Sequence, residues 1–384
     1  MTQLVAGVDP HKRSLTLAVV TPAGQQVATA SFDNSDAGIT AALGWLGGHE
    51  SAVVRVGVEG SSGHGRHLAQ RLVEAGWDVR EVPPRRTAER RRARRRAKTD
   101  VEDAVAIARA TAGEAGLGPV KPGAGLGAEV EELAVVRAHR DMLVGRRKVM
   151  LNHAEAELGR LPLSITERLG NGRAVRPRLR ALITGEPVTD ASPASTTSAS
   201  TSPVLALRLA ALQELHDDLV ELDRRIRRLE RRLAALIEAT GSTLCEERGI
   251  GVIGAAALLV EVGDPARFRS EAAFNRWWGG APVAISSGEG HGQPVRHRLD
   301  LLGNRAINSV LYTASVTQAR SYEPAQVYLA RKTSEGHSKR EARRAHKTLL
   351  GRRVIRRMWA DRRRQLDQQR QSAASTGTDH NEAA

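Results

Sequence analysis

The sequence is poor in cysteine, in aromatic residues and in long apolar runs, and each scarcity excludes a class of protein. A single cysteine, Cys245, in 384 residues excludes a disulfide framework and a cysteine-based zinc site. Aromatic residues make up 3% of the chain, which argues against binding by rows of stacked bases. No apolar run approaches a membrane span, and residues 1–9 are too short for a signal peptide. We therefore expect a cytoplasmic protein with no membrane partner.

Positive charge is what the sequence has in excess. Lys and Arg number 58 against 43 Asp and Glu, which gives a net charge of +15. Such an excess favours a polyanionic partner, because each phosphate that a basic side chain neutralises releases a condensed counterion. Arginine dominates over lysine, and its planar fork matches phosphate oxygens. The composition therefore predicts association with nucleic acid, at the nucleoid.

Residues 1–122 alternate between short apolar runs and amphipathic segments. The pattern predicts strands over residues 4–8, 15–20, 26–31, 53–58 and 77–82. It predicts helices over residues 37–46, 63–75 and 100–111. Three consecutive strands followed by alternating helices and strands is the order of an RNase H-like fold. We therefore predict an α/β domain of that type.

Residues 123–243 are predicted to form a long helical spacer. Apolar residues recur at three- and four-residue steps over 127–161, and again over 205–236 with one three-residue slip in a heptad seam. A polar, Ser-rich stretch at about 186–203 separates them and predicts a flexible linker. The two helices are expected to pair with each other or with another subunit. A hairpin that only separates the flanking domains is the interpretation we prefer.

Four carboxylates lie where a two-metal nuclease would need them. Asp9 ends the first predicted strand in GVDPHK, and Glu59 ends the fourth in VGVEG. Asp100 and Asp103 lie three residues apart at a helix start in KTDVEDA, so both face one side of a turn. Such groups can converge in an open α/β sheet, and hard oxygen ligands suit Mg²⁺, which assists phosphoryl transfer. Each motif alone is also typical of a turn, a cap or a solvated face.

A dense run of basic residues precedes the acidic helix. Residues 83–100 read PPRRTAERRRARRRAKTD, and the candidate nucleic-acid contacts in this run are Arg91, Arg92, Arg94, Arg95, Arg96 and Lys98. Blocks of this kind are often disordered tails that hold nucleic acid nonspecifically. This block lies inside a domain, between a predicted strand and the acidic helix. We therefore expect it to bring a phosphate backbone to the metal site.

Residues 244–366 are predicted to form an all-α domain, and residues 367–384 a disordered tail. Gly249 and Gly251 precede an apolar helix, where they could free backbone N–H groups for a phosphate or simply allow close helix packing; both interpretations stay open. In APVAISSG, Ser287 precedes a glycine and could attack a phosphodiester, although such a sequence is also typical of a plain loop. The basic residues that follow it are Arg296, Arg298 and Arg305.

The order of these motifs resembles the DEDD transposases of the insertion-sequence "one-ten" family. The motifs GVDPHK, VGVEG, KTDVEDA, RGIG, SSG and RLDLLGNRAIN follow one another from residue 8 to about residue 357. The resemblance implies a RuvC-like N-terminal domain, a coiled-coil spacer and a C-terminal transposase domain. It assigns Mg²⁺ to the four carboxylates and a phosphoserine intermediate to Ser287, with Ser286 as the alternative. It also implies a site-specific recombinase whose donor and target DNA are chosen by a structured RNA encoded beside the gene, acting as a dimer or tetramer.

Some residues depart from the family's pattern, and two other functions stay open. Pro10 follows the first aspartate, and Leu301 and Leu302 precede the Gly-Asn pair where a lysine is common. A RuvC-like, structure-selective nuclease would use the same carboxylates with no covalent intermediate. A nucleic-acid-binding module that has lost catalysis would bind strongly without turnover in Mg²⁺.

Overall fold

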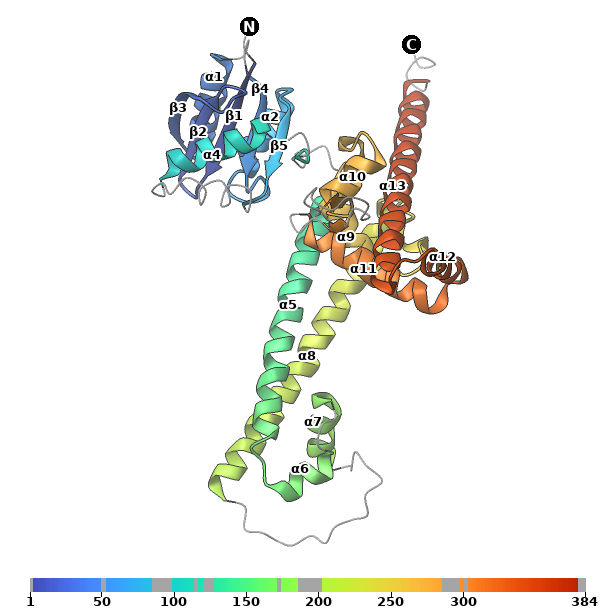
Figure 1. Cartoon of the computed structure of the whole chain (residues 1–384). Coiled ribbons are helices and arrows are strands. Elements are labelled where there is room, and N and C mark those ends of the chain that lie inside the picture. The colour runs from blue at the N-terminus through green and yellow to red at the C-terminus, as the bar shows by residue number, and fades with distance from the viewer. Residues whose placement is uncertain are drawn as a thin grey trace, which may run out of the picture. The chain divides into compact units, whose positions relative to one another are not determined.

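The computed structural model describes residues 3–49, 53–84, 99–113, 117–120, 128–170, 174–185, 202–284, 297–299 and 303–378. The chain forms two compact units, the first made of Met1–Glu131 with Ile237–Ala384 and the second of Glu132–Leu236 (Figure 1). Among the residues with described structure, no helix is long and apolar enough to cross a membrane.

The N-terminal part of the first unit contains a mixed five-stranded sheet. Its strands are β1 (Leu4–Pro10), β2 (Ser14–Val20), β3 (Gln26–Asp33), β4 (Val53–Glu59) and β5 (Val79–Val82). Their order in the sheet is β3-β2-β1-β4-β5, with β1 antiparallel to β2 and parallel to β4. Three helices accompany the sheet: α1 (Asp36–Gly47), α2 (Arg66–Glu74) and α4 (Asp100–Gly113). The predicted α/β character of this region is confirmed, and all five predicted strands are present.

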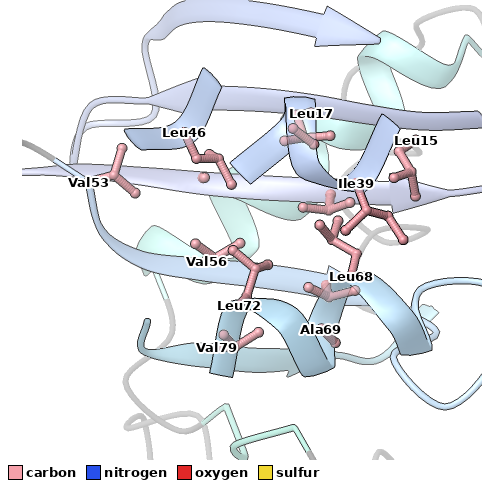
Figure 2. Packing of buried hydrophobic residues seen from close by; sticks show 14 of the residues in the cluster. Leu15, Leu17, Ile39, Leu46, Val53, Val56, Leu68, Ala69, Leu72 and Val79 are labelled. Carbon is pink, nitrogen blue, oxygen red and sulfur yellow. The ribbon is translucent and has the colours of Figure 1, made fainter. Parts of the chain in front are cut away.

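Alternation along the central strands directs their side chains to two different helical layers. Val8 of β1 and Val58 of β4 join the core that α1 and α2 cover. Val56 of β4 lies in the same core, near Leu68 and Leu72 of α2 (Figure 2). Val5 of β1 belongs instead to a cluster with Ala104 and Ala108 of α4. Because successive side chains of a strand point to opposite faces, Gly7 of β1 and Gly57 of β4 lie on the α4 face with Val5, whereas Val53, before the register shift, belongs to the other core.

Two paired glycines let α4 lie directly on the sheet. Gly7 of β1 and Gly57 of β4 are opposite each other in the parallel register. A Cβ atom on Gly7 would lie 2.2 Å from the backbone nitrogen of Ala108, and one on Gly57 would lie 1.8 Å from Oγ1 of Thr111. A larger residue at either position would push the helix off the strands. The glycines of the GVDP and VGVE sequences therefore fix the height of α4 over the ends of β1 and β4.

The second unit is built on two long antiparallel helices, α5 (Ala128–Leu158) and α8 (Pro203–Ala239). They lie side by side (Figure 1), and ion pairs join them from Glu157–Arg208 near one end to Glu132–Arg232 near the other. Two shorter helices, α6 (Leu163–Leu169) and α7 (Val175–Thr184), lie between them in the chain and were not predicted. Leu169 and Leu179 bury these helices in a core shared with α5 and α8. Residues 186–201 of the predicted linker lie outside the described residues.

The C-terminal part of the first unit is mainly helical. Its elements are η1 (Leu244–Glu246), α9 (Val252–Val262), η2 (Pro265–Arg267), α10 (Glu271–Trp277), β6 (Pro282–Ala284), β7 (His297–Leu299), α11 (Arg305–Ser321), α12 (Glu323–Ser334) and α13 (Lys339–Thr378). The buried Trp278 donates from its indole nitrogen to Oδ1 of Asn275 at 2.8 Å, beside Gly351 of α13. α10 packs on α13 through this contact.

Two predictions for the C-terminal part need correction. The domain is not all-α, because β6 and β7 form a short antiparallel pair where the sequence indicated a loop. The segment predicted as a disordered tail from residue 367 is helical as far as Thr378. Three glutamines and two alanines favour a helix there, and no glycine or proline interrupts the stretch before Gly377. Arg370 also pairs with Asp367 one turn away.

Candidate active site

Asp9 and Glu59 end neighbouring parallel strands on the face of the sheet that α4 covers. Val8 and Val58 are paired in the register of β1 and β4, so the next residue of each strand is an acid. Each acid lies two residues after a glycine that α4 contacts, Gly7 or Gly57, so its side chain points to the same face of the sheet. Asp9 is 8% exposed. The first two predicted carboxylates therefore lie at the carboxyl ends of two adjacent strands and on one face of the sheet.

The other two predicted carboxylates come from the first turn of α4. Thr99 precedes the helix and caps it, since its Oγ1 accepts from the backbone nitrogen of Glu102 at 3.2 Å and its carbonyl accepts from that of Asp103 at 3.0 Å. Asp103 is 8% exposed, while the Asp100 side chain is 60% exposed. Carboxylates in a first turn are favoured by the helix dipole. The helix therefore carries its acids to the end of the sheet where Asp9 lies.

A histidine that the sequence analysis did not select joins these acids. Nε2 of His11 lies 3.1 Å from Oδ2 of Asp9 and 3.4 Å from Oδ1 of Asp100. The potential ligand atoms of these three residues all lie within 4.8 Å of one another. His11 follows Asp9 by two residues, in the turn that begins after Pro10. The only signal in the sequence was its place in the DPH triplet, which by itself is too short to indicate a ligand.

The acidic groups influence one another electrostatically. Burial raises the pKa of the Asp9 carboxyl above its usual range, and the charges of Asp103 and Asp100 raise it further. The imidazole of His11 opposes this by lowering the pKa of Asp9, both by its charge and by its hydrogen bond. Negative charge is thus concentrated around a partly desolvated carboxylate. A cation bound between these groups would relieve the repulsion.

The loops that follow β1 and β4 contact each other through Asn34 and Gly65. Nδ2 of Asn34 donates to the carbonyl of His11 at 2.8 Å and to that of His64 at 3.0 Å. A Cβ atom on Gly65 would lie 2.8 Å from Cγ of Pro10, so the loop after β4 passes close to the end of β1. These contacts restrict the backbone that follows Asp9 and Glu59.

Most of the other predicted site residues fall in segments without a described structure. Ser287, its alternative Ser286 and Arg296 lie outside the described residues, and so do residues 85–98 of the basic run. That part of the run contains Arg91, Arg92, Arg94, Arg95, Arg96 and Lys98. Arg298 lies in β7, where it is paired with Val283. Arg305 is the first residue of α11 and is exposed. Asn304 caps that helix by accepting from the backbone nitrogen of Ile307 at 3.0 Å.

Gly249 and Gly251 differ in their surroundings. Gly249 has a φ of +86°, and a Cβ atom there would lie 3.0 Å from the Cα of Ala314 on α11. Close helix packing and left-handed backbone therefore account for Gly249. Gly251 precedes α9, and nothing lies within 4 Å of a Cβ built on it. The phosphate contact that the sequence suggested stays a prediction at both glycines.

Comparisons with known proteins agree with the layout of the chain. Residues 6–161, which include the four carboxylates, match a family model of DEDD transposases of the IS110 type, described as "Transposase". Residues 241–329 match a model described as "Transposase IS116/IS110/IS902 family". A protein of Pseudomonas aeruginosa described as "Probable family 20 transposase" is 31% identical over 272 residues, which cover 67% of this chain and 72% of that protein. The chain therefore belongs to the IS116/IS110/IS902 family of transposases, enzymes that transpose DNA.

Proposed function

We propose that this transposase is a site-specific recombinase that cuts and rejoins DNA at a Mg²⁺ site formed by Asp9, Glu59, Asp100 and Asp103. The observation that carries the proposal is the arrangement of these acids, two on adjacent strand ends and two on the helix turn packed over them. The sheet order β3-β2-β1-β4-β5 supports an RNase H-like, RuvC-like domain as the scaffold.

The donor set fits a hard divalent cation. Carboxylate oxygens are preferred by Mg²⁺, and the raised pKa of Asp9 reflects burial and repulsion that such a cation offsets. Imidazole is a poorer ligand for Mg²⁺, so we assign His11 to a neighbouring position rather than to the ligand set. When bound, the metal ion supplies neutralisation of charge at the phosphate that reacts. Asp103, being buried, is held in place by the seating of α4 on the two glycines.

The serine chemistry of the proposal rests on family membership. Oγ of Ser287 forms a bond to the phosphorus of a phosphodiester, while the bond from phosphorus to one deoxyribose oxygen breaks. The serine proton ends on the departing oxygen, which becomes a free hydroxyl. A DNA hydroxyl then attacks the phosphorus of the phosphoserine, and the bond from phosphorus to Oγ of Ser287 breaks. The serine regains its proton and the DNA is rejoined without an external energy source.

The partners we propose are donor and target DNA and a structured guide RNA encoded by the element. The net charge of +15 supports a nucleic-acid partner and association with the nucleoid. The long pair of helices α5 and α8 supports a coiled-coil spacer, and we propose that copies of the chain assemble as a dimer or tetramer. RNA that co-purifies with the protein, when the gene is expressed with its native flanks, is the first test of the guide. A single enriched RNA from the flank is expected; heterogeneous cellular RNA would contradict a dedicated guide.

Strand exchange between donor and target DNA tests the catalytic proposal. We expect Asp9→Ala and Ser287→Ala each to abolish exchange, while Asp36→Ala, which removes an exposed acid of the same domain that pairs with Arg71, leaves it unchanged. The wild-type protein should form an adduct with DNA that survives denaturant and is absent from Ser287→Ala. Cleavage by Ser287→Ala with no adduct in either protein would favour a structure-selective nuclease. Strong binding without any Mg²⁺-dependent turnover would favour a module that has lost catalysis.

A further inference from the structure

A hollow beside the last helix is lined by arginines that the catalytic proposal does not use. It has a volume of about 380 Å³ and is open to solvent. Its lining consists of Thr243, Glu247, Arg353, Arg356, Arg357, Ala360 and Arg364. The α13 residues among them recur at three- and four-residue steps, which places them on one face of the helix. Four guanidinium groups and a single carboxylate thus face the hollow.

The arginines are held in place by acids outside the hollow or at its edge. Nη1 of Arg357 donates to Oε2 of Glu246 at 2.7 Å and to the Thr243 carbonyl at 3.3 Å. Arg364 pairs with Asp361, a residue that is 5% exposed and also accepts from the backbone nitrogen of Thr243 at 2.9 Å. Each of these contacts occupies only part of a guanidinium, which has five N–H donors.

The remaining arginines follow the same scheme. Arg353 pairs with Glu247, which is itself 3% exposed and accepts from Nε2 of Gln318 at 3.0 Å. Arg356 makes a two-pronged contact with Glu271. The side chains of Arg357 and Arg364 are 29% and 51% exposed, so part of each guanidinium reaches solvent. Fixed arginines with spare donors lose little conformational entropy on binding an anion.

We propose that this hollow, which we call the α13 arginine hollow, is a binding site for backbone phosphates of nucleic acid. Planar arginine forks recognise phosphate oxygens well, and a volume in the range of ligand sites admits a phosphodiester with a neighbouring sugar. The hollow is open to solvent and its arginines are spread along α13 from Arg353 to Arg364, which suits a polymer that continues past it. The inference rests on the proposed function only for the identity of the polymer. Duplex DNA and structured RNA offer the same phosphate chemistry, and the test separates them.

The test measures binding of the full-length protein without Mg²⁺, in EDTA, so that it is independent of cleavage. Fluorescence anisotropy with a labelled random-sequence DNA duplex, and separately with a labelled RNA hairpin, is followed as a function of salt. We expect Arg357→Gln and Arg364→Gln each to weaken binding several-fold and to reduce the slope of log affinity against log salt by about 1 on at least one probe. The probe that responds identifies the polymer.

The matched control is Arg363→Gln, which removes the same charge from the adjacent residue of α13 but does not line the hollow. We expect it to leave the slope near that of the wild type. Arg364→Lys, which retains the charge, should recover most of the slope. Thermal melting shows whether each variant is folded; Asp361 keeps its contact with Thr243 in the Arg364 variants.

Equal slopes for Arg363→Gln and the hollow variants, or no change in any of them, would overturn the inference. The outcome is distinguishable from failure of the catalytic proposal, because Asp9→Ala is expected to bind both probes with the wild-type slope. If Asp9→Ala loses strand exchange while the arginine variants bind as the wild type does, the hollow is not a phosphate-binding site. The catalytic proposal would then still stand.

Discussion

Replacing Gly57 with alanine is expected to lift α4 from the sheet and to weaken the site at its first turn. The new Cβ would lie 1.8 Å from Oγ1 of Thr111 and 2.9 Å from Cγ2 of Val82, closer than any van der Waals contact allows. Alanine is favoured over glycine in a strand by about 0.5–1 kcal/mol, whereas overpacking a core costs about 1–3 kcal/mol. The overpacking should win, and we expect a net loss of about 1–2 kcal/mol in unfolding free energy.

The matching substitution Gly7→Ala should cost more, for a reason that the structure makes specific. A Cβ on Gly7 would lie 2.2 Å from the backbone nitrogen of Ala108 and 2.6 Å from the carbonyl oxygen of Ala104. Backbone atoms cannot rotate away, so the whole helix must move. The loss should reach or exceed the upper end of the overpacking range, about 3 kcal/mol. Binding of Mg²⁺ should weaken in parallel, because Asp103 moves with the helix.

Thr111→Ala distinguishes the two glycines. Removing the threonine hydroxyl gives up its hydrogen bond to the Ile107 carbonyl, 2.8 Å long, at about 1 kcal/mol, but it also removes the atom nearest to a Cβ on Gly57. In double-mutant cycles we expect Thr111→Ala to rescue Gly57→Ala by about 1–2 kcal/mol and Gly7→Ala by less than about 0.5 kcal/mol. Urea unfolding followed by circular dichroism measures both couplings. Equal rescue of both glycines, or of neither, would refute this account of how α4 is seated.

Two further predictions concern histidines. His11→Ala should weaken Mg²⁺ binding in calorimetric titration by about 10–100-fold at most, because its imidazole contacts the carboxylates of Asp9 and Asp100 from a neighbouring position and is not itself a hard ligand. A larger loss would place His11 among the metal ligands. His346 is buried and contacts Ser315 at 2.9 Å, and burial lowers the pKa of its imidazole. Its contribution to stability is therefore complete above the ordinary histidine pKa of about 6.5. That contribution is lost as the pH falls through the lower pKa of the folded protein. Melting temperature should be measured from about pH 7.5 to about pH 5, a range that includes the ordinary histidine pKa. We expect it to fall less steeply with pH in His346→Gln than in the wild type. Parallel profiles for the two proteins would contradict the assignment.

The sequence predicted the sheet because its strands carry strong local signals. Short apolar runs end on Asp9 and Glu59, and the glycines before these acids lie at positions where only a glycine fits under α4. Asp103 was found because its spacing from Asp100 matches a helical turn. These features depend on residues close together in the chain, which is why pattern reasoning reached them.

The missed features depend on contacts between distant segments. The helix around Leu179 is short, has Pro177 in its first turn and ends at Gly185, and it is stabilised by burial against α5 and α8. β6 and β7 have three residues each, too few to show a period of two. His11 was missed because its role arises from a helix that starts at Asp100, far along the chain. The α13 arginine hollow likewise combines residues more than a hundred positions apart.

The concentration of charge at Asp9 should make the active site a source of instability in the absence of metal. Its carboxylate is partly desolvated and lies near two other acids, so its charged form is disfavoured in the folded protein. Asp9→Asn removes that charge but keeps an oxygen that can accept from His11. In EDTA at neutral pH, we expect the variant to unfold at a higher temperature than the wild type, by an amount equivalent to about 0.5–2 kcal/mol, as is common for residues retained for activity.

Addition of Mg²⁺ should reverse this order. A ligand that binds only the folded state at a hundred times its dissociation constant stabilises by about 2.7 kcal/mol, and the wild type should gain this while Asp9→Asn gains little. Differential scanning fluorimetry over a Mg²⁺ titration would then show the two melting temperatures crossing. A variant that is less stable than the wild type in EDTA would show that Asp9 is retained for the fold. Equal stabilisation of both proteins by Mg²⁺ would place the metal elsewhere, because a site that depends on this carboxylate cannot bind equally well without its charge.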